Sequence, residues 1–439
     1  MHIHAHVEVE EDIYSFTSAD NGAGPLWCHG STIVARWEDS VYVTGLETLP
    51  EHEPLHNCRW LLFQKKTESW RLIHRDKTGR TREPSPVALL GNGDLLVSAN
   101  PTLTEADRYS GPAEPTVFRF PFGQPPPGRE LPQWQGDSQA NPFTEHSYRT
   151  FVADAETNQA LYIQNTGMET AQLSFLDRDS SWWGVGQLRW PWEHERYESV
   201  LRLCYPSVFL KDRSVHFLGT ADIVEPFEVW RTEKHKITGR SWDYVFRRLF
   251  YTSTNDIMEE PFGQWIEITD LESFAGHVSN QDIWIDQSGL AHLLWKESAI
   301  DLRLRKSFFP EQKQSHRLVY ATIRDGQIEQ KQVLIETIEG EYGWNPICAR
   351  FHQLPTGELL VISSLTPNVS VSGLPNCIFQ FSVVKEFEWF EVPIIEPITG
   401  IFLTNTVRGG SKPSDILDLV GMSPREPNTL AYIQIRFDD

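Results

Sequence analysis

Side chains that could do chemistry recur at one place in a series of similar segments, immediately before or beside an apolar stretch. In residues 344–364, WNPICARFHQLPTGELLVISS, Trp and Asn precede two apolar stretches joined by a short turn with Gly. Two such stretches around a short turn containing Gly or Asp are typical of a β-hairpin. The candidate residues at this place in all the segments are His29, Arg59, Arg82, Glu83, His146, Arg149, Tyr205, Asn280, Asp282, Trp344, Asn345 and Arg408.

One reaction that fits these side chains is β-elimination on a uronic acid. In that reaction a cation neutralises the carboxylate, a base removes the neighbouring proton and an acid protonates the leaving oxygen. The acid and base candidates are His29, His146 and Tyr205. Arg82 and Arg149 are the candidates for holding the carboxylate.

Glycoside hydrolysis is the second reaction that fits, and it requires two carboxyl groups on either side of the bond to be cleaved. Glu83, Asp282 and Glu297 are the candidate carboxyls. The sequence does not specify their separation, so elimination and hydrolysis remain alternatives. No GxSxG motif is present to support a Ser-His-Asp mechanism.

The candidate cations belong to an acidic chain with a formal charge of −21, and they are Arg59, Arg82, Arg149 and Arg408. A local positive pocket on an acidic protein suits a small anionic ligand held by bidentate contacts. The alternative is that each arginine pairs with a neighbouring carboxylate, such as Glu83 or Asp282. Trp27 and Trp344 stand beside the candidate positions and could stack on sugar rings.

Composition narrows the possible partners of this 439-residue chain. Its negative charge argues against nucleic acids and anionic membranes, which require a basic surface. The first residues show no basic region followed by a long apolar stretch, and no apolar run is long enough to span a bilayer. We therefore expect a soluble protein, cytoplasmic by default, or secreted or periplasmic if a leader has been removed.

Cysteine and histidine patterns give no strong metal or disulfide signal. Five Cys without paired spacing do not indicate a disulfide framework or a zinc site. His2, His4 and His6 alternate along an expected strand and could bind a metal, although such alternation is also typical of a solvated edge strand. We expect no cofactor and no catalytic metal. A structural Ca²⁺ in the channel is compatible with the sequence but has no diagnostic motif.

The candidate residues must be positioned by the repeated hairpins. Such segments occur at residues 29–48, 82–100, 146–165, 205–222, 280–298 and 344–364, with a degraded seventh at 404–422. Most are followed by a second hairpin, which gives the four strands of a propeller blade, and the repeats recur roughly every 55 to 75 residues, as in large blades with insertions. The pattern predicts an all-β fold, a seven-bladed β-propeller of four-stranded antiparallel blades in a single domain, 1–439.

The two ends of the chain are expected to share a blade. Only three strand candidates, FLTNTV, SDILDLV and LAYIQIRF, follow the sixth blade, while residues 2–16 form an alternating strand without a partner nearby. Joining this N-terminal strand to the C-terminal blade would close the ring and remove the free sheet edges. Residues 224–254 form the longest insertion, with a short helix expected at 242–250.

In a blade of this topology, the loop entering the innermost strand and the loop leaving the second strand lie on the same face of the ring, which we call the front face. The candidate residues would therefore converge on the central mouth from every blade. Propeller channels are also commonly lined by polar groups that bond to one another or to water. A structural role for individual residues is thus the alternative to a binding site.

The segments WCHGSTIVARWEDSVYV and GWNPICARFHQLPTGELLVIS resemble blades of the BNR-repeat, sialidase-like propellers. That group includes sialidases, polysaccharide lyases such as ulvan lyases, and rhamnosidases. The Asp-box of sialidases is present only as the fragment SADNGAGPLW. The lyases of this fold use His, Tyr and Arg, a set that His29, His146, Tyr205 and Arg149 resemble by type and approximate place.

Together, the residues and the resemblance indicate a carbohydrate-active enzyme, a polysaccharide lyase or glycoside hydrolase acting on an acidic or deoxy sugar at the central mouth. The expected partner is an oligosaccharide or a small anionic sugar. The alternative function is a non-catalytic propeller that binds a glycan or a protein. The sequence carries no signal for an oligomeric state.

Overall fold

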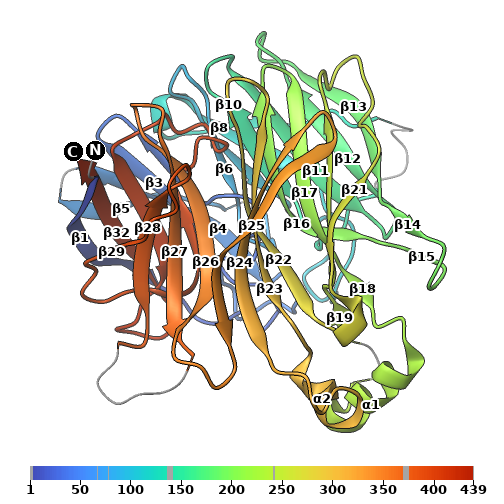
Figure 1. Cartoon of the computed structure of the whole chain (residues 1–439). Helices are drawn as coiled ribbons and strands as arrows, with labels where there is room; N and C mark the ends of the chain where they lie inside the picture. The colour runs from blue at the N-terminus through green and yellow to red at the C-terminus, as the bar shows by residue number, and fades with distance from the viewer. Residues whose placement is uncertain are drawn as a thin grey trace.

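The computed structural model is a ring of seven four-stranded antiparallel sheets, which confirms the predicted seven-bladed β-propeller (Figure 1). It describes residues 3–66, 68–77, 79–135, 142–240, 243–368 and 375–438. Each of the first six blades runs in chain order from its innermost to its outermost strand, so consecutive strands are hydrogen-bonded neighbours.

The strands of the first three blades have the following bounds. Blade one contains β2 (Val34–Trp37), β3 (Ser40–Thr48), β4 (Cys58–Lys66) and β5 (Ser69–Arg75). Blade two contains β6 (Val87–Leu89), β7 (Leu95–Ala99), β8 (Thr116–Phe120) and β9 (Gly128–Glu130), with a 3₁₀ turn at Pro121–Gly123. Blade three contains β10 (Thr150–Asp154), β11 (Gln159–Thr166), β12 (Thr170–Leu176) and β13 (Trp182–Arg189).

The remaining blades carry the insertions. Blade four contains β16 (Leu203–Lys211), β17 (Ser214–Ala221), β20 (Arg248–Thr254) and β21 (Ile266–Asp270). Blade five contains β22 (His277–Ile285), β23 (Ala291–Ser298), β24 (Ser315–Arg324) and β25 (Gln327–Ile338). Blade six contains β26 (Trp344–Gln353), β27 (Leu359–Pro367), β28 (Ile378–Val383) and β29 (Phe390–Val392).

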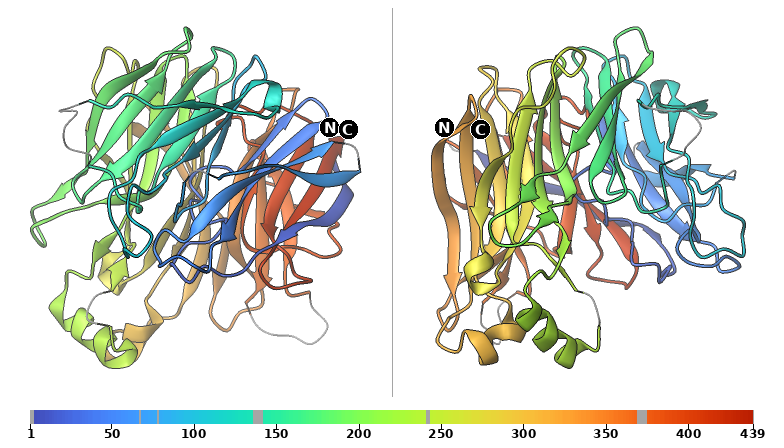
Figure 2. Two further views of the ribbon diagram at one scale, coloured as in Figure 1. Left: turned by 180° about the vertical axis from the view of Figure 1, so that it is seen from behind. Right: turned by 90° about the vertical axis from the view of Figure 1, so that its right-hand side faces the viewer.

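Blade seven joins both ends of the chain. It contains β30 (Thr399–Thr404), β31 (Ile416–Met422), β32 (Thr429–Asp438) and the N-terminal β1 (His4–Ser15), in the order β1-β32-β31-β30. The N- and C-termini consequently lie side by side (Figures 1 and 2). Exposed ion pairs reinforce the pairing, with 2.6 Å between Glu8 and Arg436 and 2.6 Å between Asp12 and Arg425. The predicted closure is consistent with this sheet.

The innermost strands surround the channel and explain the apolar runs of the sequence. Contacts between neighbouring innermost strands run β2-β6-β10-β16-β22-β26-β30 and back to β2. The short strand β6 is fully buried on both faces, so all three of its residues are apolar. The core fills the spaces between blades, as where Val152 of blade three and Phe217 of blade four belong to one apolar cluster. Outer strands such as β25 are largely exposed and carry polar residues.

The seventh repeat begins earlier than predicted. Thr404 is the last residue of the innermost strand β30, whereas the sequence indicated that it precedes that strand. Phe402 and Leu403 are buried in the core, and the polar run after them resembles the residues that enter the other innermost strands. Arg408 therefore lies in the loop that leaves β30, where its carbonyl oxygen accepts a hydrogen bond from the Ala153 backbone at 3.0 Å.

The helix predicted at 242–250 is wrong within the described residues; residue 242 lies outside them. Arg248–Thr254 form β20, the third strand of blade four, because their apolar side chains pack between blades. The insertion contains α1 (Glu228–Thr238), which ends at Gly239 with a left-handed φ of 71°. α1 packs against α2 (Leu302–Phe308) of blade five at one end of the molecule (Figure 1).

Small elements complete the insertions. Two-stranded sheets are formed by β14 (Trp192–Glu193) with β15 (Ser199–Val200) and by β18 (Ile223–Val224) with β19 (Tyr244–Val245), and a second 3₁₀ turn covers Glu272–Phe274. Among the described residues, no helix is long and apolar enough to cross a membrane.

Deletion of residues 1–15 tests the closure of the ring. Ten residue pairs join β1 to β32, and a net hydrogen bond contributes about 0.5–1.5 kcal/mol, so the free energy of unfolding should fall by roughly 5 kcal/mol. The exposed edge of β32 should also promote self-association. Urea unfolding and light scattering measure both effects. His4→Ala, at an exposed position of the same strand, should behave as wild type, and an unchanged deletion variant would contradict this account of closure.

Candidate functional site

Five aromatic rings from three parts of the chain meet at the front face of the channel. Trp27 stacks on Tyr148 with a 5.0 Å centroid distance, and His29 stacks on Tyr205 at 4.5 Å. His146 lies 4.4 Å from Tyr148 and 5.3 Å from Trp27. We call these five residues the aromatic cluster. Its members precede β2 and β10 or lie at the start of β16, so the repeat brings together residues that are far apart in sequence.

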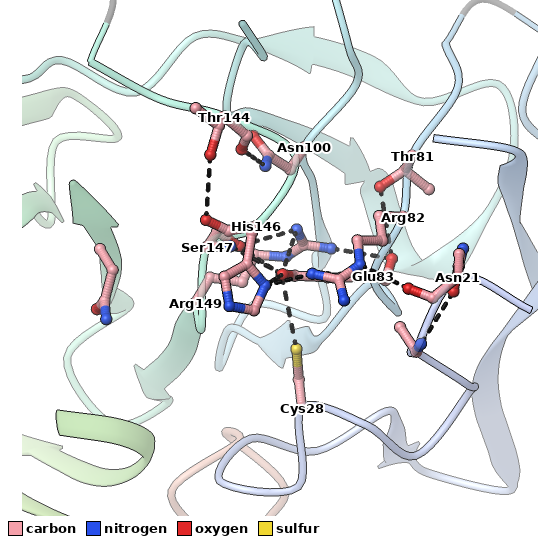
Figure 3. Close-up of polar contacts among 12 residues, drawn as sticks. Asn21, Cys28, Thr81, Arg82, Glu83, Asn100, Thr144, His146, Ser147 and Arg149 are labelled. Atoms are coloured by element: carbon pink, nitrogen blue, oxygen red, sulfur yellow. Dashed lines mark hydrogen bonds and ion pairs between the residues drawn. The ribbon is translucent and has the colours of Figure 1, made fainter. Parts of the chain in front are cut away.

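A fully buried carboxylate, Glu83, lies next to His146 of the aromatic cluster (Figure 3). It accepts hydrogen bonds from the Ser147 backbone at 2.8 Å and from the Ser147 hydroxyl at 2.5 Å. His146 Nδ1 is 3.3 Å from Glu83 Oε1, and the buried Arg149 is 3.6 Å from Oε2. Burial opposes ionisation, but His146, Arg149 and Ser147 together lower the pKa of Glu83 to about 2. Glu83 is therefore an anion at neutral pH.

Arg82 lies above this carboxylate and contacts the aromatic cluster. Its Nε donates to the Asn21 carbonyl oxygen at 2.9 Å, and its Nη1 contacts Nδ1 of His146 (Figure 3). The guanidinium lies 5.4 Å from the ring centroid of Trp27, which is a cation–π arrangement. Among the described residues, no carboxylate forms an ion pair with Arg82. Its charge is thus available to an anionic ligand.

Burial holds His29, Tyr148 and Tyr205 in their neutral forms. Burial, together with the cations Arg350 and Lys296, lowers the pKa of His29 to about 3. Burial also raises the pKa of Tyr148 and of Tyr205 far above the ordinary value. At neutral pH His29 is an uncharged imidazole and both tyrosines are phenols. A phenol with a raised pKa can donate a hydrogen bond or a proton, but it cannot act as a base.

Two tyrosines of the cluster have a backbone conformation that is unusual for bulky residues. Tyr148 has φ 42° and Tyr205 has φ 48°, both in the left-handed region. Such conformations cost about 1–3 kcal/mol each and occur frequently at functional sites. Tyr205 lies at a register shift in β16, between Cys204 and Ser207. At this shift the Tyr205 ring stacks on that of His29.

Deeper in the channel, the predicted residues are bonded to the protein itself. Arg408 donates from Nε to Asp282 Oδ1 at 2.7 Å, and the backbone of Phe351 donates to Asp282 Oδ2 at 2.9 Å. The buried Asn280 donates to the Tyr205 carbonyl oxygen at 2.7 Å, which anchors the strained backbone of the cluster. These three residues form the floor beneath the mouth.

The other predicted residues lie apart from the cluster. Arg59 pairs with Glu47 at 2.5 Å on the second and third strands of blade one. Glu297 accepts a hydrogen bond from the indole of Trp295 at 2.7 Å. Trp344 and Asn345 begin β26. No ring contact among the described residues links Trp344 to the aromatic cluster. Asn345 Oδ1 is buried and has no hydrogen-bond partner among the described residues.

Four further residues lie beside the cluster and were not predicted from the sequence. Phe246 lies 6.4 Å from Tyr205 and 5.5 Å from His277, measured between ring centroids. The guanidinium of Arg202 lies 5.2 Å from the Tyr148 ring, and Lys296 lowers the pKa of both His29 and His277. Arg202 and His277 stand just before or at the start of an innermost strand, so the rule that found Tyr205 could have found them. Phe246 lies in an insertion without a repeat.

One hollow is lined in part by a residue of the cluster, and a second lies beyond Tyr205, beside Phe246 and His277. One has a volume of about 510 Å³ and is lined mainly by apolar residues that include Trp27 and Leu26. The other, of about 300 Å³, is lined by residues that include Phe246 and His277. In the described ranges, no group of three or more His, Cys, Asp or Glu could hold a metal ion. His6 lies 3.1 Å from Asp438, and residue 2 is outside the described ranges.

The most informative comparisons are with solved structures. A ulvan lyase, bound to a GlcA(1-4)Rha3S repeat, has a TM-score of 0.53 and 8% identity over 98% of this chain and 95% of its own. A polysaccharide lyase, Uly1, has a TM-score of 0.48 and 10% identity over 99% and 98% of the two chains. An α-L-arabinanase from Penicillium chrysogenum, complexed with arabinobiose, has a TM-score of 0.43 and 12% identity over 80% and 91%.

The similarity to the ulvan lyase shows the propeller fold alone, because the identity is only 8%. No family model matches the chain, and no curated protein matches it. The resemblance to BNR-repeat, sialidase-like blades therefore stays a prediction, whereas the neighbours are propeller glycosidases and lyases.

Gly30→Ala should destabilise the protein. A Cβ at Gly30 would overlap the carbonyl oxygens of Tyr205 and Pro206, so the segment carrying His29 would have to move away from blade four. Overpacking of this kind costs about 1–3 kcal/mol in the free energy of unfolding, which urea titration measures. Gly24→Ala in the same segment meets nothing within 4 Å and serves as the matched control. Equal stability of the two variants would contradict this contact.

His29→Phe should reduce the sensitivity of stability to acid. Between pH 6.5 and about 3, the unfolded chain binds a proton at His29 that the folded chain does not, so the free energy of unfolding falls as the pH falls. One proton corresponds to about 1.4 kcal/mol per pH unit. Phenylalanine retains the stacking on Tyr205 and removes this contribution. Parallel plots of unfolding free energy against pH for the two proteins would refute the prediction.

Proposed function

We propose that this propeller is a polysaccharide lyase that cleaves a uronic-acid-containing glycan by β-elimination at the aromatic cluster. The observation that carries the proposal is the combination, at one mouth of the channel, of a cation without a carboxylate partner, an imidazole oriented by a buried anion, and a neutral phenol. Arg82, His146 and Tyr205 are these three groups. They supply the three functions that elimination requires.

Arg82 is suited to the carboxylate of the uronate. Elimination begins with loss of the proton on the carbon next to that carboxylate, and neutralising the carboxylate makes this proton more acidic. A guanidinium binds a carboxylate through two parallel hydrogen bonds. Arg82 is partly exposed and its charge is not neutralised by a neighbouring carboxylate, whereas Arg149 and Arg408 are buried against Glu83 and Asp282.

His146 is suited to the role of base. Its Nδ1 lies between the guanidinium of Arg82 and the carboxylate of Glu83. When Arg82 turns to a substrate carboxylate, Nδ1 carries the proton and donates it to Glu83, which leaves the lone pair of Nε2 free. The side chain of His146 is 29% exposed, so a ligand can reach it. Glu83 has no exposed surface and acts as a positioning residue.

Tyr205 is suited to protonating the leaving group. Its raised pKa keeps the phenol protonated at neutral pH, and His29 stacks on its ring. In the reaction, the proton passes from carbon to Nε2 of His146, its bonding electrons form the carbon–carbon double bond, and the bond to the glycosidic oxygen breaks. Tyr205 then gives its proton to that oxygen. The hollow lined in part by Trp27 offers space for a neighbouring sugar.

The carboxylates favour elimination over hydrolysis. A glycosidase requires one carboxyl with a raised pKa and a second one facing it across the bond. Glu83 has a lowered pKa and no exposed surface, and Asp282 is paired with Arg408 in the floor of the channel. Neither is placed to protonate a glycosidic oxygen. The non-catalytic glycan-binding propeller is the outcome that the following experiment would favour if no glycan is cleaved.

His146→Gln and Tyr205→Phe should each lower kcat on a uronate-containing polysaccharide by about 10²–10⁴-fold, because each removes one proton-transfer group. The assay screens a panel of polyuronates for the ultraviolet absorbance of the unsaturated product, alongside release of reducing ends. His235→Gln, on an exposed face of α1, is the control and should retain full activity.

The melting temperatures of both variants should remain close to that of the wild-type protein. Reducing ends without ultraviolet absorbance would indicate hydrolysis and contradict the proposed reaction. Failure of the wild-type protein to cleave any glycan of the panel would favour the binding propeller. Full activity of the His146→Gln variant would exclude His146 as the base.

A further inference from the structure

The charges around the channel are not balanced. Two of its cations have carboxylate partners, since Arg149 pairs with Glu83 and Arg408 pairs with Asp282. Two further cations, Arg350 and Lys296, form no ion pair with any carboxylate among the described residues. This is unusual in a chain with a formal charge of −21, whose surface offers many carboxylates.

Arg350 is bonded entirely to neutral acceptors. Its Nη2 donates to the His29 carbonyl oxygen at 3.0 Å and its Nε to the Phe402 carbonyl oxygen at 3.2 Å, while Nη1 contacts the Gln281 carbonyl oxygen. The side chain is 2% exposed. These contacts satisfy its donors but leave the charge uncompensated. Arg350 therefore gives the blade-six side of the mouth a fixed positive potential.

Lys296 lies closer to the surface in the same region. It belongs to β23, paired with Ser279 near the front end of blade five, and its Nζ contacts only one acceptor among the described residues, the Ile347 carbonyl oxygen. The side chain is partly exposed. An ammonium has three donors, so it can bind a further acceptor. Burial and Arg350 lower the pKa of Lys296, and Lys296 in turn lowers that of His29 and His277.

An uncompensated buried charge is costly, and an anion from outside the chain would remove part of that cost. We propose that Lys296, backed by Arg350, is a second anion-binding subsite that holds a carboxylate or sulfate group of the glycan. This inference rests on the proposed function in taking the ligand to be a glycan. It assigns to the ligand a second negative group, in addition to the uronate carboxylate bound by Arg82.

Arg82 and Lys296 lie on different sides of the aromatic cluster. Arg82 contacts Trp27 and His146, whereas Lys296 acts on His29 and His277. Tyr205 contacts both Trp27 and His29 and thus lies between the two groups. A chain that crosses Tyr205 would place negative groups of different sugar units on Arg82 and on Lys296. The preferred substrate is therefore a polyanionic glycan.

Titration calorimetry with inorganic sulfate tests the subsite without any glycan. Arg82→Gln removes the first anion site, so sulfate binding in this variant should report on Lys296. Adding Lys296→Met should weaken that binding at least tenfold, while adding Lys296→Arg should retain it. Lys331→Met is the matched control, because Lys331 also lies on blade five and donates to a carbonyl oxygen, that of Ile268. Equal sulfate binding with and without Lys296 would overturn the proposal.

Kinetics on the glycan separate this proposal from the proposed function. Lys296→Met alone should raise KM at least tenfold and leave kcat within about twofold, since Lys296 does not transfer a proton. A larger rise on a sulfated glycan than on a plain polyuronate identifies the bound group as sulfate, and an equal rise identifies it as carboxylate. If the wild-type protein cleaves no glycan but Lys296 still binds sulfate, the lyase function fails and the anion site stands. If cleavage occurs with KM unchanged by Lys296→Met, the subsite fails and the lyase function stands.

Discussion

The candidate site depends on one buried carboxylate, that of Glu83. It stands just before the innermost strand of blade two and binds Ser147, His146 and Arg149, which stand just before the innermost strand of blade three. Burying an ion costs several kcal/mol unless partners compensate, and removing a buried charged partner such as Arg149 costs about 3–5 kcal/mol. Glu83 thus holds two blades in register and orients His146 at the same time. The same buried carboxylate therefore serves both the stability of the fold and the proposed reaction.

The electrostatic potential at the mouth depends on which of its cations have a carboxylate partner and which do not. Asp282 neutralises Arg408 in the floor, and Glu83 compensates Arg149. Arg82 at the surface has no carboxylate partner among the described residues, and burial keeps His29 and Tyr205 uncharged. A mouth of this kind attracts an anion and offers it uncharged proton donors and acceptors, within a protein that otherwise repels anions.

Much of this arrangement could be predicted from sequence because the fold repeats. Positions before the innermost strands lie at equivalent places in a ring, so hairpin spacing alone placed Glu83, His146 and Tyr205 together. The same rule misplaced Arg408, because the polar run after β30 resembles the residues that enter other innermost strands. It could not place Phe246, which comes from an insertion. The helix in that insertion was also predicted in the wrong position, since β20 has an apolar pattern too short to distinguish from a helix.

Protonation states and charge balance could not be predicted from sequence. Glu83 was a candidate for glycoside hydrolysis until its burial and its contacts with several donors were known, and Arg149 was a candidate clamp until its pairing with Glu83 was known. Lys296 lies on a second strand and gave no signal, because its significance depends on Arg350, which comes from another blade. Such properties arise from pairs of residues that only the closed ring brings together.

The most direct measurement of the central claim is the ¹⁵N NMR spectrum of the His146 imidazole, assigned by its loss in His146→Gln. With a uronate ligand bound, the account predicts a neutral ring with the proton on Nδ1 and a bare Nε2, and a change of tautomer population in Glu83→Gln. A proton fixed on Nε2 in both proteins would contradict the role of Glu83 and, with it, the assignment of His146 as the base.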